Sequence, residues 1–340
     1  MLYAAIDIGT VTCRLLVCKI ERGIQQELVR ECRIVNLGIG VSKTGILQED
    51  AIERVVSCVK EYRELVRAIA QKEEVPSIPI GTVATSASRD ARNAGELVSR
   101  LHELGVDLLV IAGEVEADLS FRGASAEFPD ERLVVVDVGG GSTEVIFGSA
   151  QEGVLFSHSF NIGCRRITEM FLASDPPRIE ELANAREFIT EELHSVLGIR
   201  FEGFFPDRVV AVAGTATSVV SVDEAIEVYD SARVHKTVVS RETLLRVATM
   251  LAALPEEERK CVVGLEPKRA GVIVAGMLIL ECVLDVLGQD SFTVSESDIL
   301  QGIIAALDRR IPPFDAVLSP PAKYGRISGN EIRRKAASVA

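Results

Sequence analysis

The chain has 340 residues, of which 47% are hydrophobic and 26% are charged, and this composition is typical of a globular protein with room for two cores. Its 50 acidic and 37 basic residues give a formal net charge of -13, which disfavours nucleic acid as a partner because like charges repel at long range. Asp7 interrupts the first apolar run and no cationic segment precedes it, so a secretory signal is not expected.

Two similar segments in separate halves of the chain predict a repeated β-hairpin. In the first, an apolar run ends at Asp7, and a loop with one glycine and two hydroxyls leads into a second β-rich run at 13–20. In the second, an apolar run ends at Asp137, and a loop with three glycines and two hydroxyls leads into a β-rich run at 144–147. We interpret each unit as a hairpin bent around an aspartate.

Helices and strands alternate after the first hairpin. The spacing of apolar residues predicts a helix over 49–71, a strand over 78–84, a helix over 88–104, a strand over 107–111 and a helix over 114–123. After the second hairpin it predicts helices over 164–171 and 179–197, a strand over 208–212, a helix after Gly214, helices over 241–254 and 270–287, and a strand over 291–294 before a last helix. This alternation favours α/β layering.

The triple-glycine loop carries the strongest chemical signal. Glycines let backbone N–H groups approach phosphate oxygens without a Cβ in the way, and the adjacent hydroxyls add donors. The flanking acids suit a Mg²⁺ that shares its coordination shell with substrate phosphates and water. A tight turn alone would explain the glycines, but the acids and the matching first loop favour a phosphate cradle. Its candidate residues are Asp137, Gly139, Gly140, Gly141, Ser142, Thr143 and Glu144.

Two other loops offer the same chemistry in weaker form. The first loop supplies Asp7, Gly9 and Thr10. Gly214 and Thr215 open a predicted helix, and the N-terminus of a helix attracts anions. For Thr215, a structural helix cap is an equally good explanation.

Glu116 and Arg89 are candidates on the segments that follow two short strands. Glu116 lies in the first turn of a predicted helix, at the sheet edge where ligand clefts form, and a carboxylate there could orient and deprotonate an attacking water. The alternative is an acid that only complements the helix dipole. Arg89 could clamp phosphate through its guanidinium fork, or it could belong to a solvated helix face.

Cysteines, histidines and hydropathy favour a reduced, cytoplasmic protein without a membrane span. The seven cysteines show no close metal-type pairing, which favours free core thiols. The four histidines are too scattered for a zinc site, so any metal is expected to have oxygen ligands. The most apolar stretch, 270–280, is shorter than the roughly 20 residues that a membrane helix requires.

Together these motifs resemble the Ppx/GppA phosphatase family, within the actin, sugar kinase and heat-shock chaperone superfamily. The resemblance rests on the segments 7–14, 84–93, 113–117, 137–144 and 214–217, and on the shorter matches at 37–38 with 44–45, Gly163 with Arg165, and Arg269 with 275–276. It implies an α/β fold of two ribonuclease-H-like domains with a cleft between them. The first domain is expected at 1–125 and the second at 126–311, followed by a C-terminal extension at 312–340.

The resemblance also implies an activity and a site. The family releases terminal phosphate from inorganic polyphosphate or from guanosine pentaphosphate, with Mg²⁺ as the expected cofactor and a homodimer as the expected assembly. By resemblance, Glu116 is the catalytic glutamate, and Asp137 and Glu144 are the carboxylates for metal and water. The positions that match phosphate-contacting residues are Thr10, Arg89, Gly139, Gly140, Gly141, Ser142, Thr143 and Thr215.

Some positions depart from the family pattern. Val11 and Thr12 stand where the family usually has Asn-Ser or Asn-Thr, which removes an amide that could meet phosphate. Gly271 stands where aspartate is common, and the segment 298–301 lacks the usual arginine. Longer members carry an additional C-terminal helical domain for which this chain has no room, so we expect substrate preference and processivity to be affected.

Two other classes of function stay open at this point. A kinase or chaperone-type ATPase of the same superfamily would use the same loops on nucleotide phosphates. A non-catalytic binder of polyphosphate or of the guanosine nucleotide would retain the cradle without the chemistry. The presence of both metal carboxylates and of the candidate base favours catalysis.

Overall fold

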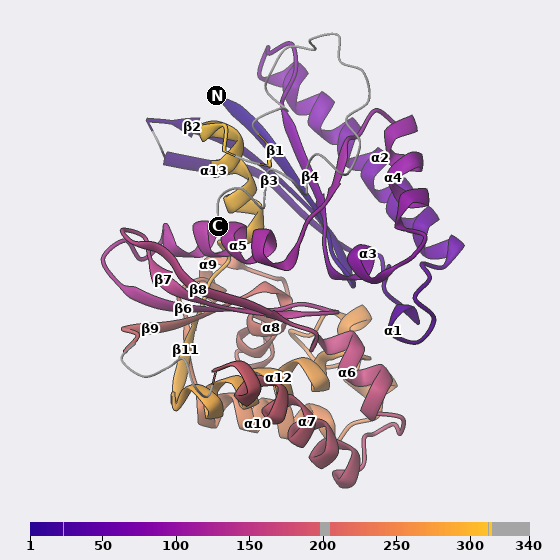
Figure 1. Ribbon diagram of the computed structural model, residues 1–340, viewed down its shortest axis with the longest axis vertical. Helices are drawn as coiled ribbons and strands as arrows, with labels where there is room; N and C mark the ends of the chain where they lie inside the picture. Colours follow the sequence, from indigo (N-terminus) through magenta and orange to yellow (C-terminus); the bar gives the residue numbers. More distant parts are fainter. Residues whose placement is uncertain (23, 198–204, 312, 315–340) are drawn as a thin grey trace.

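The structure, a computed structural model, describes residues 1–22, 24–197, 205–311 and 313–314, and it arranges them around two β-sheets (Figure 1). The predicted C-terminal extension at 312–340 lies almost wholly outside the described residues, apart from 313 and Phe314. Phe314 is buried against the first sheet.

The first sheet has the strand order β3-β2-β1-β4-β5. Its strands are β1 (Leu2–Ile8), β2 (Thr12–Glu21), β3 (Ile24–Ile34), β4 (Ile80–Ala84) and β5 (Leu108–Val110). β1, β2 and β3 pair antiparallel, whereas β4 and β5 run parallel to β1. Ala4 and Ile6 of β1 contribute to a core on one face, and Tyr3 and Ala5 contribute to a core on the other, as the two-residue period of a strand requires.

The second sheet repeats this order as β8-β7-β6-β9-β11, with β10 added at its edge. Its strands are β6 (Arg132–Val138), β7 (Thr143–Ser149), β8 (Gly153–Phe160), β9 (Arg208–Val212), β10 (Val238–Ser240) and β11 (Ser291–Val294). β6, β7 and β8 pair antiparallel, and β9 and β11 run parallel to β6. Each half is therefore a ribonuclease-H-like unit, and the repeated hairpin predicted from the sequence is confirmed.

Most helices cover the outer faces of the two sheets (Figure 1). The first half contains α1 (Val41–Thr44), α2 (Glu49–Lys72), α3 (Ser86–Asp90) and α4 (Ala94–Glu103). The second half contains α6 (Cys164–Phe171), α7 (Ile179–Leu197), α8 (Ala213–Asp223), α9 (Ser231–Val234), α10 (Arg241–Ala252), α11 (Glu256–Arg259), a 3-10 turn at Pro267–Arg269 and α12 (Ile273–Leu287). Among the described residues, no helix has the length and apolarity needed to cross a membrane.

Two helices fill the space between the sheets. α13 (Ile299–Arg309) packs on the first sheet, and α5 (Gly113–Ser125) packs on the second. The two helices also cross in close contact, because a Cβ on Gly302 would lie 1.9 Å from the carbonyl oxygen of Leu119. α13 thus joins the core of the first sheet although it lies within the range 126–311, and the division at residue 125 stays a prediction.

Some elements differ from the sequence prediction. The helix expected over 88–104 is two helices, because Ala91 is extended and the Asn93 side chain bonds both the N–H and the carbonyl of Leu47, at 2.8 and 3.0 Å. The helix expected from residue 270 begins at Ile273, after the 3-10 turn. The strands β3, β8 and β10 were not predicted.

Candidate active site

A cavity of about 900 Å³ lies where the two hairpin loops and the start of α8 meet. Its walls come from both sheets and from α5. The sequence-predicted residues that line it are Asp7, Gly9, Thr10, Glu116, Asp137, Gly139, Gly140, Gly141, Ser142, Gly214 and Thr215. The predicted residues Arg89, Thr143 and Glu144 do not line it. Asp137 and Glu116 share this one cavity, as the water-activation hypothesis requires.

The loops of the two hairpins approach each other closely at Gly140. A Cβ on Gly140 would lie 2.6 Å from a methyl carbon of Val11 and 2.8 Å from Cβ of Thr10, so a larger residue would push the loops apart. The hydroxyl oxygen of Thr10 is buried and has no hydrogen-bond partner. The close approach leaves glycine backbone and a free hydroxyl at one wall of the cavity, which suits a phosphate oxygen.

Val11 has a packing role. It is 6% exposed and forms a small apolar cluster with Cys164 and Val272, which belong to the second half. Its carbonyl accepts hydrogen bonds from the N–H groups of Val35 and Asn36, both at 2.9 Å. The residue therefore joins the first loop to the opposite wall by apolar contact instead of by an amide.

Glu116 lies in the first turn of α5 and is buried. Burial raises the pKa of its carboxyl to about 7, and the neighbouring Arg89 guanidinium opposes this rise. Arg89 Nη1 donates to Glu116 Oε2 and to the Ile111 carbonyl, the latter at 3.2 Å. Arg89, predicted as a phosphate clamp, is thus paired with the candidate base in this structure.

Asp137 is the penultimate residue of β6 and is 7% exposed. Its Oδ2 accepts a hydrogen bond from Ser120 Oγ at 2.9 Å. Burial raises the pKa of the carboxyl to about 6, and the nearby Asp298 adds to the rise. A carboxylate that is costly to ionise alone is a group that a cation would stabilise.

Thr143 and Glu144 do not line the cavity. Thr143 Oγ1 donates to the Ile162 carbonyl at 2.5 Å, so its hydroxyl is used within the protein. Glu144 is 1% exposed and accepts from Ser159 Oγ at 2.6 Å. Burial raises the pKa of Glu144, and the negative charge of Glu116 is the next cause. Glu144 belongs to the same buried acidic group as Glu116 and Asp137 and lies opposite Asp137 across the β6–β7 hairpin, but it does not line the cavity.

The third loop forms the N-terminus of α8. α8 begins at Ala213, and Thr215 Oγ1 donates to the Val138 carbonyl at 3.4 Å, which ties this loop to the end of β6. A Cβ on Gly214 would overlap the guanidinium of Arg269, so the glycine lets this arginine lie across the loop. Lys268 and Arg269 both line the cavity and supply positive charge at this end.

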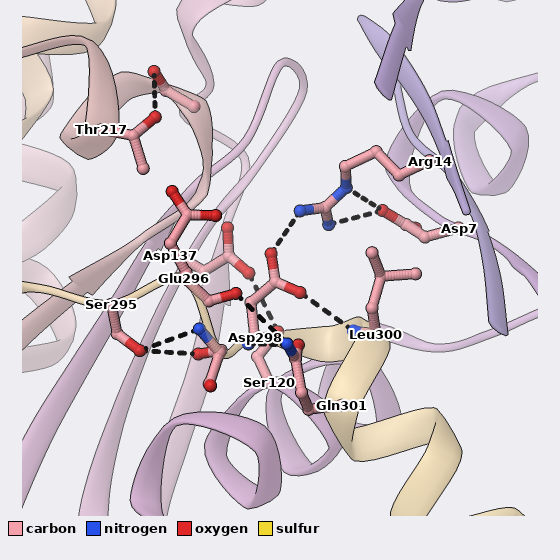
Figure 2. Close-up of polar contacts among 12 residues, drawn as sticks. Asp7, Arg14, Ser120, Asp137, Thr217, Ser295, Glu296, Asp298, Leu300 and Gln301 are labelled. Carbon is pink, nitrogen blue, oxygen red and sulfur yellow. Dashed lines mark hydrogen bonds and ion pairs between the residues drawn. The ribbon is translucent and has the colours of Figure 1, made fainter. Parts of the chain in front are cut away.

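Arg14 and Asp298 are cavity residues that sequence reasoning missed as a functional pair. Arg14 lies opposite Asp7 in the β1–β2 register, and its Nε and Nη2 donate to Asp7 Oδ2 at 3.1 and 2.7 Å. Its Nη1 donates to Asp298, which caps α13 (Figure 2). The register of the hairpin could have identified Arg14 as the partner of Asp7 from the sequence, whereas the contact with Asp298 depends on the tertiary fold.

The oxygen donors around the cavity fit a partly hydrated Mg²⁺ better than a preformed metal cage. Within the described ranges, no group of three or more His, Cys, Asp or Glu residues has the arrangement of a metal-ligand cluster. Asp7 Oδ1 is buried without a hydrogen-bond partner, and the nearby carboxylates are costly to ionise. Mg²⁺ commonly binds through one or two carboxylates together with substrate phosphates and water, which agrees with this donor set.

Two ribonuclease-H-like units that enclose glycine loops and buried carboxylates in one cavity define an enzyme that acts on phosphate groups. The model of the Ppx/GppA phosphatase family matches residues 16–309, and the chain belongs to this family. It is therefore a phosphatase, and the resemblance seen in the sequence is confirmed.

Relatives and solved structures agree with this assignment. The chain is 36% identical to Exopolyphosphatase 2 of Mycobacterium tuberculosis, over 89% of this chain and 98% of that protein. It is 35% identical to the bifunctional 3-dehydroquinate synthase/phosphatase of Fusobacterium nucleatum, over 89% of this chain but only 46% of that protein's length. The crystal structure of the Aquifex aeolicus Ppx/GppA family member superposes with a TM-score of 0.74 at 32% identity, covering 91% of this chain and 98% of that one.

Proposed function

We propose that the enzyme is an exopolyphosphatase that releases terminal orthophosphate from inorganic polyphosphate by metal-assisted attack of water. The observation that carries the proposal is a buried glutamate with a pKa of about 7 that shares one cavity with three phosphate-type loops. The similarity to Exopolyphosphatase 2 of Mycobacterium tuberculosis supports the choice of substrate.

The three loops would hold the terminal phosphate. Backbone N–H groups of the loop 139–142 and the hydroxyl of Thr10 would contact its oxygens, and the N-terminus of α8 would add a favourable dipole. Lys268 and Arg269 would neutralise the next phosphates of the chain. Because the protein is strongly acidic overall, this local positive charge is needed to bind a polyanion.

Glu116 would act as the general base. Arg89 bonds Glu116 Oε2, which leaves Oε1 to accept a proton from water. The water oxygen would attack the terminal phosphorus, the bond to the bridging oxygen would break, and the shortened chain would leave. A pKa near neutrality makes the carboxylate basic enough to take the proton while a useful fraction remains ionised at pH 7.

The carboxylates would hold the metal. Asp137 lines the cavity and is the first candidate ligand. Glu144 does not line the cavity but would add negative charge that favours cation binding. When bound, Mg²⁺ would neutralise phosphate charge and polarise the phosphoryl group.

Guanosine pentaphosphate is a second candidate substrate. Besides Lys268, the cavity lining includes Ile226, Leu265 and Tyr229, and Tyr229 is 52% exposed. An apolar and aromatic wall next to cations suits a nucleoside attached to a phosphate chain. An ATPase or kinase activity would use the same wall, and a non-catalytic binder would use the loops alone.

Phosphate release from polyphosphate, guanosine pentaphosphate and ATP, each with Mg²⁺ and with a chelator, tests the proposal. We expect polyphosphate turnover that needs Mg²⁺, and loss of turnover by about 10³-fold or more in Glu116→Gln with substrate binding retained. Glu114→Gln is the matched control, because Glu114 lies in the same helical turn but is exposed. Turnover of ATP alone, or an unchanged rate in Glu116→Gln, would contradict the proposal.

A further inference from the structure

We propose that Asp298 is a positioning residue that acts through Arg14, and that this pair holds Asp7 with one carboxylate oxygen facing the substrate cavity. The inference rests on the proposed function, because it assigns Asp7 to the phosphate end of the same site.

The guanidinium of Arg14 is held from two sides. Nε and Nη2 both donate to a single oxygen, Asp7 Oδ2, at 3.1 and 2.7 Å, and Nη1 donates to Asp298 Oδ2 (Figure 2). The Arg14 and Asp298 side chains are 15% and 4% exposed, so both charges are largely removed from water. The planar guanidinium is therefore fixed in orientation, and so is the carboxyl group of Asp7.

This arrangement leaves one oxygen of Asp7 for a ligand. Both Arg14 bonds fall on Oδ2, while Oδ1 is buried and has no hydrogen-bond partner in the protein. Asp7 is 4% exposed and lines the cavity. A buried carboxylate oxygen without a partner is costly, so this oxygen suits a bound water, a protonated phosphate oxygen or a hydrated cation.

Asp298 is itself a fixed point. Its Oδ1 accepts from the Leu300 N–H at 3.0 Å, and its own N–H donates to the Gln301 side chain at 3.0 Å, which together form a capping box at the start of α13. Its carbonyl group is packed against Gly123 of α5, where no Cβ would fit. A residue whose backbone and side chain are fixed in this way can hold the charged side chain of Arg14 in place.

Asp298 also contacts helix α5, which carries Glu116. α5, which packs against Asp298 at Gly123, carries Glu116 in its first turn and Ser120, whose hydroxyl donates to Asp137. Arg14 also lies within the electrostatic reach of Asp137. If the charge of Asp298 were removed, Arg14 would lose one of its two carboxylate partners, and its guanidinium would be free to turn toward Asp137. We therefore expect Arg14 to compete with the cation there.

Asp298→Asn separates this charge from the helix cap, because asparagine caps helices as well as aspartate does. With wild-type binding of polyphosphate retained, we expect kcat to fall by about tenfold and the Mg²⁺ concentration for half-maximal rate to rise several-fold. Arg14→Ala should lose more activity, and added guanidinium should restore part of it. Glu281→Gln is the control: Glu281 is a buried acid, bonded to Arg186 at 2.6 Å, away from the cavity.

Three results would overturn the proposal. The first is a kcat of Asp298→Asn within twofold of the wild-type value, and the second is a loss of activity that Glu281→Gln reproduces at the same loss of thermal stability. The third is that guanidinium does not rescue the activity of Arg14→Ala. If the wild-type protein releases no phosphate from any polyphosphate, the proposed function fails instead. The positioning claim is then decided by the ¹⁵N NMR signal of Arg14 Nε, assigned by its absence in Arg14→Lys. A signal unchanged by Asp298→Asn would refute the claim, and a shifted or broadened one would support it.

Discussion

The two hairpins share one topology, yet the residue that faces the aspartate across the strands has opposite charge. In the first hairpin Asp7 lies opposite Arg14, and in the second Asp137 lies opposite Glu144. The first aspartate therefore has an internal counter-charge. The second faces another acid and lies near Glu116, and burial raises the pKa of all three carboxyl groups of this second group.

The same repeated unit can therefore take two different roles. A single cross-strand residue, arginine or glutamate, decides whether the aspartate has a counter-charge within its own hairpin, although burial still raises the pKa of Asp7 and Arg14 also lowers that of Asp137. In the proposed mechanism the first half would contribute a fixed carboxylate oxygen and a phosphate contact, and the second half would bind the metal.

The largest effect is expected from Asp137→Asn. Asparagine keeps the shape and can still accept from Ser120 Oγ, but it removes the charge proposed to bind the cation. We expect kcat/KM for polyphosphate to fall by about 10³-fold, with loss of the dependence on Mg²⁺ concentration.

Asp7→Asn is the matched variant in the other half. Because Arg14 keeps Asp298 as a partner, we expect this protein to retain a clear Mg²⁺ response even though its rate falls. A Mg²⁺ titration of both variants by phosphate release measures the contrast. If Asp7→Asn loses the Mg²⁺ response and Asp137→Asn keeps it, the assignment of the metal to the second half is wrong.

A smaller effect is expected from the loop glycines. A Cβ on Gly140 would meet Val11 and Thr10 at 2.6 and 2.8 Å, whereas a Cβ on Gly95, which does not line the cavity, would have no neighbour within 4 Å. Gly140→Ala should therefore separate the two loops and lower kcat/KM by about 10²-fold, while Gly95→Ala should stay within about twofold of wild type. Equal rates in the two variants would show that close approach of the loops is not needed.

The sequence predicted most elements of the two sheets, and the reason for the omissions is physical. β1, β6 and β9 are buried on both faces and read as continuous apolar runs. β3 has no buried residue and β8 only one, so neither shows the apolar pattern on which such predictions depend.

The site was predictable to the extent that its chemistry is local. The loops around Asp7, Asp137 and Gly214 contain their glycines and hydroxyls within a few residues, and these loops do meet at one cavity. Contacts made by the fold were not predictable. Arg14 and Asp298 are 284 positions apart. The pairing of Arg89 with Glu116 likewise depends on how α3 and α5 are placed.

In the metal-free protein, the buried acidic residues of the second group should lower the free energy of unfolding. The pKa of Glu116 rises from its ordinary value of 4.5 to about 7 in the folded protein. Below pH 4.5 the carboxyl is protonated in both the folded and the unfolded chain. Between pH 4.5 and 7 the unfolded chain releases this proton while the folded protein retains it, so the free energy of unfolding falls as the pH rises.

We expect Glu116 to lower the free energy of unfolding by about 2 kcal/mol between pH 5 and pH 8 in the presence of a chelator, which urea unfolding at several pH values measures. Glu116→Gln should reduce this dependence, because its side chain does not titrate, and the part that remains should come from Asp137 and Glu144, whose pKa values are also raised. Mg²⁺ should reduce the loss in the wild-type protein, since a cation bound near Asp137 favours the ionised acids. A wild-type stability that rises from pH 5 to pH 8 without metal would mean that the second hairpin is internally neutralised like the first, and the contrast between the two halves would not hold.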